Sequence, residues 1–153
     1  MSRTGIIFNR TFRHTITNLR WDTLPSHTIK EVLKDGRAFS YFIEPWLTQL
    51  YPLIHVKGYK DHDFIDLKTQ SVKFDEKTFT KNGCKYVPSY MIGSGRKFNQ
   101  DKFIEKANNL VYVIVSNINF PHINVKFVEG KELIKKYPKG GIPLGDHDKF
   151  FSK

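Results

Sequence analysis

The feature that most constrains the fold is an unbroken apolar run from Val111 to Val115. A strand with one face in water alternates apolar and polar side chains, whereas a strand buried on both faces does not. We therefore expect this run to be the central strand of a sheet. Residues 99–110 carry apolar side chains at helical spacing before it, and residues 123–128 alternate after it. These patterns predict a helix capped near Asn99 and a second strand beside the first.

The first half of the chain has one clear amphipathic helix. From Arg37 the apolar residues recur every three or four positions: Phe39, Phe42, Ile43, Trp46, Leu47 and Leu50. Pro45 must kink this helix or mark a fresh start. A strand over Leu53–Lys57 follows, bracketed by Pro52 and Gly58, and Lys60–Asp63 has the composition of a polar turn. The sequence therefore predicts a helix followed by strands in this half.

Other segments are assigned by composition. Residues 1–25 are basic and ambiguous between helix and strand, and a short helix ending at Lys34 follows them. Residues 75–82 are polar and end in a turn signal, and a third strand is expected over 85–92. Residues 130–137 predict a short basic helix, and the Gly- and Pro-rich residues 139–153 predict a loop. We expect a single α/β domain over residues 1–153.

Composition narrows the classes of function. The chain has a formal net charge of +10, which favours a polyanionic partner, nucleic acid before acidic membrane. Cys84 is the only cysteine, which excludes an intrachain disulfide and a cysteine metal cluster. The sequence has no apolar run of membrane-spanning length and no secretory pattern at residues 1–10, so an intracellular, cytoplasmic location is expected.

The stretch Asp61–Gln70 carries the most specific chemical signal. Read as an extended strand, it places Phe64, Asp66, Lys68 and Gln70 on one face. A carboxylate and an ammonium two residues apart then reach the same point. That point suits a divalent metal bound by oxygen, with a lysine beside it to orient a water molecule. The ordinary interpretation of an isolated Asp-x-Lys is an ion pair on a half-exposed strand.

The element order helix, strand, strand, strand, helix, strand, with Asp-x-Lys on the second strand, resembles the PD-(D/E)xK nuclease superfamily. The likeness covers residues 37–118 and is sharpest at Phe64–Thr69, which is similar to that family's strand of apolar residue, acid, any residue, Lys and Thr. The resemblance implies a restriction-endonuclease-like core, a mixed central sheet flanked by helices. It also implies hydrolysis of DNA phosphodiester bonds with Mg²⁺, for which Mn²⁺ is a substitute.

The resemblance assigns roles to residues of this strand. Asp66 would bind the metal, and Lys68 would orient or activate the attacking water. Glu44 lies where several family members carry an extra metal-binding acid. Asp61 is the expected first acid, because it ends the preceding arm of the hairpin, and Gln70 is a further candidate on the catalytic face.

Two alternatives concern the first acid of the motif. Asp63 is disfavoured because it is close to Asp66 on the same strand and points to the opposite face. In a second register, Asp66 is the first acid and Asp75-Glu76-Lys77 supplies the later pair. This register ranks lower because no apolar strand surrounds residues 75–77.

The expected function is that of a site-specific endonuclease, of homing or restriction type, acting on double-stranded DNA. A chain with one active site that cuts both strands favours a homodimer. The expected DNA contacts are basic residues from three segments: Arg10, Arg13, Arg20, Lys73, Arg96 and Lys97. The alternatives are a recombination-type exonuclease and a non-catalytic nucleic-acid-binding module. In such a module Tyr86, Tyr90 and Phe98 would stack on bases.

Overall fold

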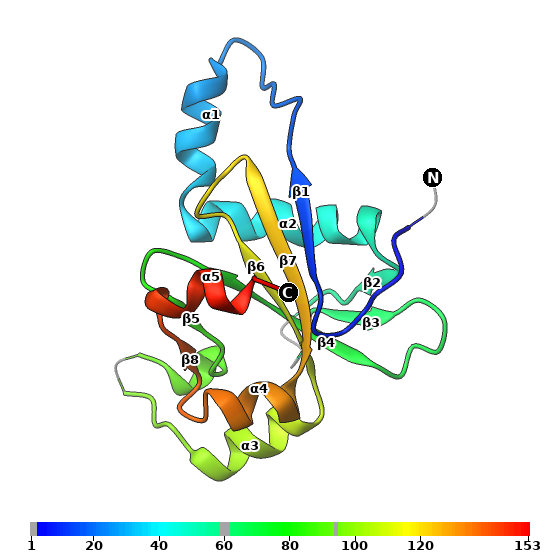
Figure 1. Cartoon of the computed structure of the whole chain (residues 1–153), viewed down its shortest axis with the longest axis vertical. Helices are drawn as coiled ribbons and strands as arrows, with labels where there is room; N and C mark the ends of the chain where they lie inside the picture. Colours follow the sequence, from blue (N-terminus) through cyan, green and yellow to red (C-terminus); the bar gives the residue numbers. More distant parts are fainter. Residues whose placement is uncertain (1–2, 59–61, 94) are drawn as a thin grey trace.

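A mixed six-stranded sheet organises the computed structural model, which describes residues 3–58, 62–93 and 95–153 (Figure 1). The strand order is β1 (Thr11–Thr15), β7 (His122–Glu129), β6 (Val111–Ser116), β4 (Lys73–Phe79), β3 (Phe64–Asp66) and β2 (Leu53–His55). β4 and β6 run parallel, and the other neighbouring strands run antiparallel. A small second sheet pairs β5 (Cys84–Lys85) with β8 (Gly141–Ile142). The protein therefore has an α/β fold with a mixed sheet.

Helices cover both faces of this sheet. α1 (Ser26–Leu33) and α2 (Gly36–Leu50) share an apolar cluster with Val111, Val113 and Val115 of β6. α3 (Gln100–Asn108), α4 (Gly130–Lys136) and α5 (His147–Phe150) share the opposite cluster with Tyr112 and Ile114. All six residues of β6 are buried, which confirms the prediction of a central strand covered on both sides. Figure 1 shows α1 at one end of the long axis and α3 and α4 at the other.

Two helices, α2 and α3, begin at side-chain caps. The Asp35 carboxylate accepts hydrogen bonds from the backbone N–H groups of Arg37 and Ala38 at the start of α2. Pro45 lies inside α2 without ending it. Asn99 caps α3 through the N–H of Lys102, as the sequence predicted. No helix in the described ranges is both long and apolar enough to cross a membrane.

Two strand predictions were wrong. The expected strand over 61–70 is only β3, because residues 67–71 form a turn, and residues 59–61 lie outside the described residues. The expected third strand over 85–92 contains only the end of β5 and a 3₁₀ turn over Ser89–Met91. The third strand of the meander is instead β4, in a segment that sequence composition marked as a polar connection. Its two acids, Asp75 and Glu76, are buried by the sheet and its covering helices, which composition does not show.

The C-terminal segment is ordered structure rather than the predicted loop. It contributes β8, a 3₁₀ turn over Leu144–Asp146 and α5, and it buries Phe150 and Phe151 in the core. Basic side chains hold its carbonyl groups. Arg13 donates to Phe151 O at 3.1 Å, and Lys126 donates to Phe150 O. The N-terminal strand β1 is thus joined to this segment, and residues 11–15 are not a free arm.

Candidate acidic site

Two carboxylates face each other where β3 and β4 diverge. Phe64 pairs with Phe74 in the antiparallel ladder, so Asp63 lies opposite Asp75 one residue further along. The backbone N–H of Asp63 still donates to Phe74 O at 2.8 Å. The Asp63 side chain then accepts a hydrogen bond from the backbone N–H of Glu76, also at 2.8 Å. At the point where the ladder ends, the acceptor for the backbone N–H of Glu76 in β4 is therefore the Asp63 carboxylate.

The closeness of these two acids changes their protonation. Burial, the negative charge of Asp75 and a hydrogen bond with its carboxyl group together raise the pKa of Asp63 to about 7. Glu44 adds a smaller repulsive contribution to the pKa, while the hydrogen bond from Glu76 N–H opposes the rise. Two adjacent carboxylates cannot both be charged at low cost unless a proton or a cation lies with them. The pair therefore favours a bound proton or a bound cation.

Lys77 completes this site. Its Nζ lies 3.4 Å from Asp75 Oδ2, and the two side chains are only 20% and 12% exposed. Residues 75 and 77 share a face because side chains alternate along a strand. Phe74-Asp75-Glu76-Lys77-Thr78 also repeats the order apolar residue, acid, any residue, Lys and Thr. The later pair of the second register is therefore on a strand, and Asp63, not Asp66, is the acid beside it.

A second group of acids lies toward α2. Glu76 alternates with Asp75 and shares the parity of Phe74, which packs in the α1–α2 cluster. Burial, with smaller contributions from the charges of Asp63 and Glu44, raises the pKa of Glu76 to about 8, although a 2.8 Å hydrogen bond from the Thr78 hydroxyl opposes the rise. Glu44 Oε2 of α2 lies 3.0 Å from His55 Nε2 of β2, which is a hydrogen bond or, when His55 is protonated, an ion pair. Glu44 is therefore within electrostatic reach of both Asp63 and Glu76.

The residues expected to be catalytic on the Asp-x-Lys strand lie elsewhere. The Asp66 carboxylate accepts hydrogen bonds from Thr69 Oγ1 and from the backbone N–H groups of Thr69, Ser71 and Val72. These bonds hold the pKa of Asp66 well below its ordinary value. Lys68 and Gln70 are exposed in this turn, and Gln70 has a left-handed backbone with φ of 56°. The acid closes a turn, so it does not share a strand face with Lys68. Asp61 lies outside the described residues.

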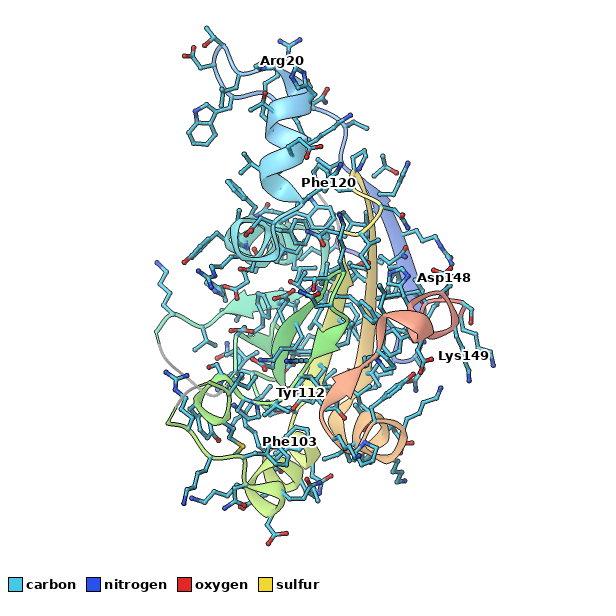
Figure 2. All side chains as sticks on the ribbon, turned by 90° about the vertical axis from the view of Figure 1, so that its left-hand side faces the viewer. Arg20, Phe103, Tyr112, Phe120, Asp148 and Lys149 are labelled. Carbon is cyan, nitrogen blue, oxygen red and sulfur yellow. The ribbon has the colours of Figure 1, made fainter. Side chains whose placement is uncertain are left out.

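The expected DNA contacts do not gather around the acidic site. Arg20 is at the far end of the molecule from Phe103 (Figure 2), and Arg13 is engaged with the C-terminal segment. Arg96 donates to Ser89 O at 2.7 Å, which braces its own loop. The remaining three are exposed: Arg10, Lys73 and Lys97. Of these, Lys73 begins β4, two residues before Asp75.

Of the three aromatic residues expected to stack on bases, one is buried and two are exposed. Tyr86 is fully buried, so a stacking role for this residue was wrong. Tyr90 and Phe98 are 51% and 45% exposed. Lys106 Nζ lies 5.3 Å from the centroid of the Tyr90 ring, which leaves a cationic and aromatic surface there.

A hollow of about 460 Å³ lies away from the acidic site, between α1, α2 and the segment that leads to α1. Its lining is apolar and includes Leu19, Trp21, Phe42 and Trp46, with Arg20 at its side. Asp, Glu, His and Ser do not line it. It offers apolar contact and no group for hydrolysis.

Sequence analysis missed a Ser–His–Asp chain. Ser116 Oγ lies 2.7 Å from His147 Nε2, and His147 Nδ1 lies 2.8 Å from Asp148 Oδ1. Ser116 is only 2% exposed, and the rings of Phe79 and Phe151 pack against the imidazole. Figure 2 shows Asp148 at the outer side of α5. With its hydroxyl enclosed, Ser116 fixes α5 to the end of β6 rather than meeting a substrate.

A metal ion at this site would have two protein carboxylates as its ligands. Among the described side chains, no three of His, Cys, Asp or Glu form a group able to hold a metal ion. Mg²⁺ is usually bound by one or two carboxylates and keeps several waters or substrate phosphates. Asp63 and Asp75 provide two such carboxylates, and the charge of the pair favours a cation.

Asp63, Asp75 and Lys77 together form the candidate acidic site. These three side chains come from two neighbouring strands of the meander, and they combine paired acids with a cation. Comparison with protein-family models, with curated proteins and with solved structures found no match to this chain.

Proposed function

We propose that the protein is a Mg²⁺-dependent DNA nuclease whose site is Asp63, Asp75 and Lys77. The observation that carries this proposal is the pairing of two carboxylates across β3 and β4 with a lysine on the same face. The order α2, β2, β3, β4, α3 and β6, with the short strand β5 and a 3₁₀ turn between β4 and α3, supports a restriction-endonuclease-like core. So does the mixed sheet, with helices on both of its faces.

The roles of the residues follow from their charges. Asp63 and Asp75 would hold Mg²⁺, which supplies stabilisation of the charge that develops on the scissile phosphate. Asp63 stays anchored to the backbone N–H of Glu76, so its free oxygen has a fixed direction. Lys77 keeps its ammonium beside Asp75, where it can donate to the attacking water or to a phosphate oxygen. Glu44 lies at the edge of the pair and adds negative charge that favours a cation.

Double-stranded DNA is the substrate that the charge favours. The net charge of +10 attracts phosphates from a distance, and exposed Lys73 brings a cation to the strand that holds Asp75. Within this proposal the enzyme is an endonuclease that acts as a homodimer, one site for each DNA strand. An exonuclease would use the same chemistry. A non-catalytic binding module is favoured only by the net charge and by exposed Tyr90 and Phe98.

The test is cleavage of a supercoiled plasmid with Mg²⁺ and with EDTA. Replacing Asp75 by Asn or Lys77 by Ala should reduce the rate about 100-fold or more, because each removes a charged group at the reaction centre. The matched controls are Asp66→Asn and Lys68→Ala, which change the same residue types in the adjacent turn. These controls should retain the wild-type rate per folded molecule.

The outcomes separate the site from the function. Loss of cleavage in the Asp66 and Lys68 variants, with full activity in the Asp75 and Lys77 variants, would place the chemistry in the turn. A folded wild type that binds DNA and cleaves neither plasmid nor linear DNA with Mg²⁺ or Mn²⁺ would refute the nuclease function. Discrete fragments indicate a specific endonuclease, and progressive shortening from ends indicates an exonuclease.

A further inference from the structure

Tyr112 lies on the strand next to the acidic site. It is the second residue of β6, and the parallel register pairs it directly with Asp75 of β4. Paired residues on adjacent strands project from the same face with their β-carbons about 5 Å apart. Figure 2 shows Tyr112 inside the molecule, in the layer between the sheet and α3. Its ring therefore stands beside the carboxylate that the proposed function places on the cation.

The hydroxyl of Tyr112 is buried without a partner among the described residues. The residue is 1% exposed, and its Oη makes no hydrogen bond within that part of the chain. Burying a hydroxyl without a partner costs free energy, and most such groups bond to protein or to an ordered water. The negative charge of Asp75 also acts on this hydroxyl, raising the pKa of Tyr112 beyond the effect of burial. The unpaired hydroxyl and the acid thus belong to neighbouring residues on the same face of the sheet.

Tyr86 shows what the same side chain does when it is purely structural. Its ring lies 5.1 Å from that of Tyr112, in the same apolar cluster. Its hydroxyl donates to the carbonyls of Leu133 and Tyr137 in the α4 region. Two neighbouring buried tyrosines therefore differ in one respect, because one hydroxyl is satisfied by the protein and the other is not.

We propose that Tyr112 is a positioning residue of the acidic site, whose hydroxyl binds an ordered water that also hydrogen-bonds to the Asp75 carboxylate. This inference rests on the proposed function, because it assigns Asp75 to the cation. A water held by the hydroxyl and the carboxylate satisfies both groups and fixes the direction of the Asp75 oxygens. Groups that orient a metal-binding carboxylate from behind typically change metal affinity by 10- to 100-fold. Tyr112 would act on the reaction through Asp75 and would not touch the substrate.

The test is calorimetric titration of Ca²⁺ and Mg²⁺ into the wild type, Tyr112→Phe and Tyr86→Phe, each checked by urea denaturation in EDTA. Phenylalanine keeps the ring and removes only the hydroxyl. Tyr112→Phe should weaken cation binding about tenfold or more and leave the denaturation midpoint in EDTA unchanged or higher. Tyr86→Phe should lower the midpoint and leave the cation affinity of the folded protein unchanged.

The inference and the proposed function can fail separately. If the wild type binds Ca²⁺ or Mg²⁺ and Tyr112→Phe binds them equally well, the positioning role is refuted while the acidic site stands. If the two tyrosine variants lose cation affinity in proportion to lost stability, Tyr112 is only structural. A wild type that binds neither cation overturns both.

Discussion

Replacing Asp63 by Asn should make the protein more stable at alkaline pH when no cation is present. In the unfolded chain this carboxyl ionises near its ordinary pKa of 3.8, whereas in the folded protein the pKa rises to about 7. Between about pH 4 and pH 7 the folded state therefore holds a proton that the unfolded state has lost, and the free energy of unfolding falls as the pH rises. Asn keeps an oxygen for the N–H of Glu76 and removes the charge.

The expected size follows from the change in pKa. A rise from 3.8 to about 7 corresponds to a loss of unfolding free energy on the order of 4 kcal/mol at most, once the group is fully ionised. Solvent reaches part of the side chain, so we expect about 2 to 4 kcal/mol at pH 8. Below about pH 4 Asp63→Asn and the wild type should differ little, because the carboxyl is then largely protonated in the unfolded state as well as in the folded state.

The assay is urea denaturation from pH 5 to pH 8 in EDTA, repeated with Ca²⁺. The wild type should lose stability along this series and regain it with Ca²⁺, because a bound cation replaces the proton. Asp63→Asn should follow a flatter profile and respond weakly to Ca²⁺. The control is Asp22→Asn, an exposed acid in a left-handed position that Asn also tolerates. If Asp63→Asn loses stability with pH as steeply as the wild type does, Asp63 is not the group that ionises.

Two further predictions concern the basic residues and the buried serine. Arg20→Ala should lower the slope of log K against log salt for DNA binding by about 0.9 if Arg20 contacts a phosphate. Arg13→Ala should instead lower stability, because its guanidinium holds the Phe151 carbonyl; equal slopes for both variants and the wild type would refute the contact at Arg20. Ser116→Ala should destabilise the fold by about 1–3 kcal/mol in urea, because His147 loses its buried partner. Ser152→Ala, at an exposed hydroxyl, is the matched control, and equal losses from both would contradict this prediction.

The parts of the fold that were predictable are those with one dominant hydrophobic pattern. The repeat from Phe39 to Leu50 predicted α2, and the run from Val111 to Val115 predicted β6. In both, burial follows directly from side-chain polarity. β4 was missed for the opposite reason, because Asp75 and Glu76 are 8% and 7% exposed although both are acids. In a sequence, a buried acid at a site cannot be told from an acid on the protein surface.

The candidate site was predicted in type but not in position. An aspartate two residues before a lysine occurs twice, at Asp66 and at Asp75, and the first has the more apolar neighbours. What separates them is turn chemistry, since Asp66 and Thr69 close a turn with side-chain hydrogen bonds. Asp63 was set aside because its parity differs from that of Asp66. The antiparallel pairing of β3 with β4 places Asp63 opposite Asp75, on the same face of the sheet.

The way in which residues 141–151 are built into the fold limits when the surroundings of the acidic site can be completed during synthesis. β8 supplies the partner of β5, and Phe150 and Phe151 fill the core beneath Phe79 of β4, the strand of the acidic site. A nascent chain that has reached α4 lacks these groups, so the face of β4 that carries Asp75 is still incomplete. Under the proposed function, a chain would therefore acquire its complete acidic site only after residues 141–151 have been synthesised.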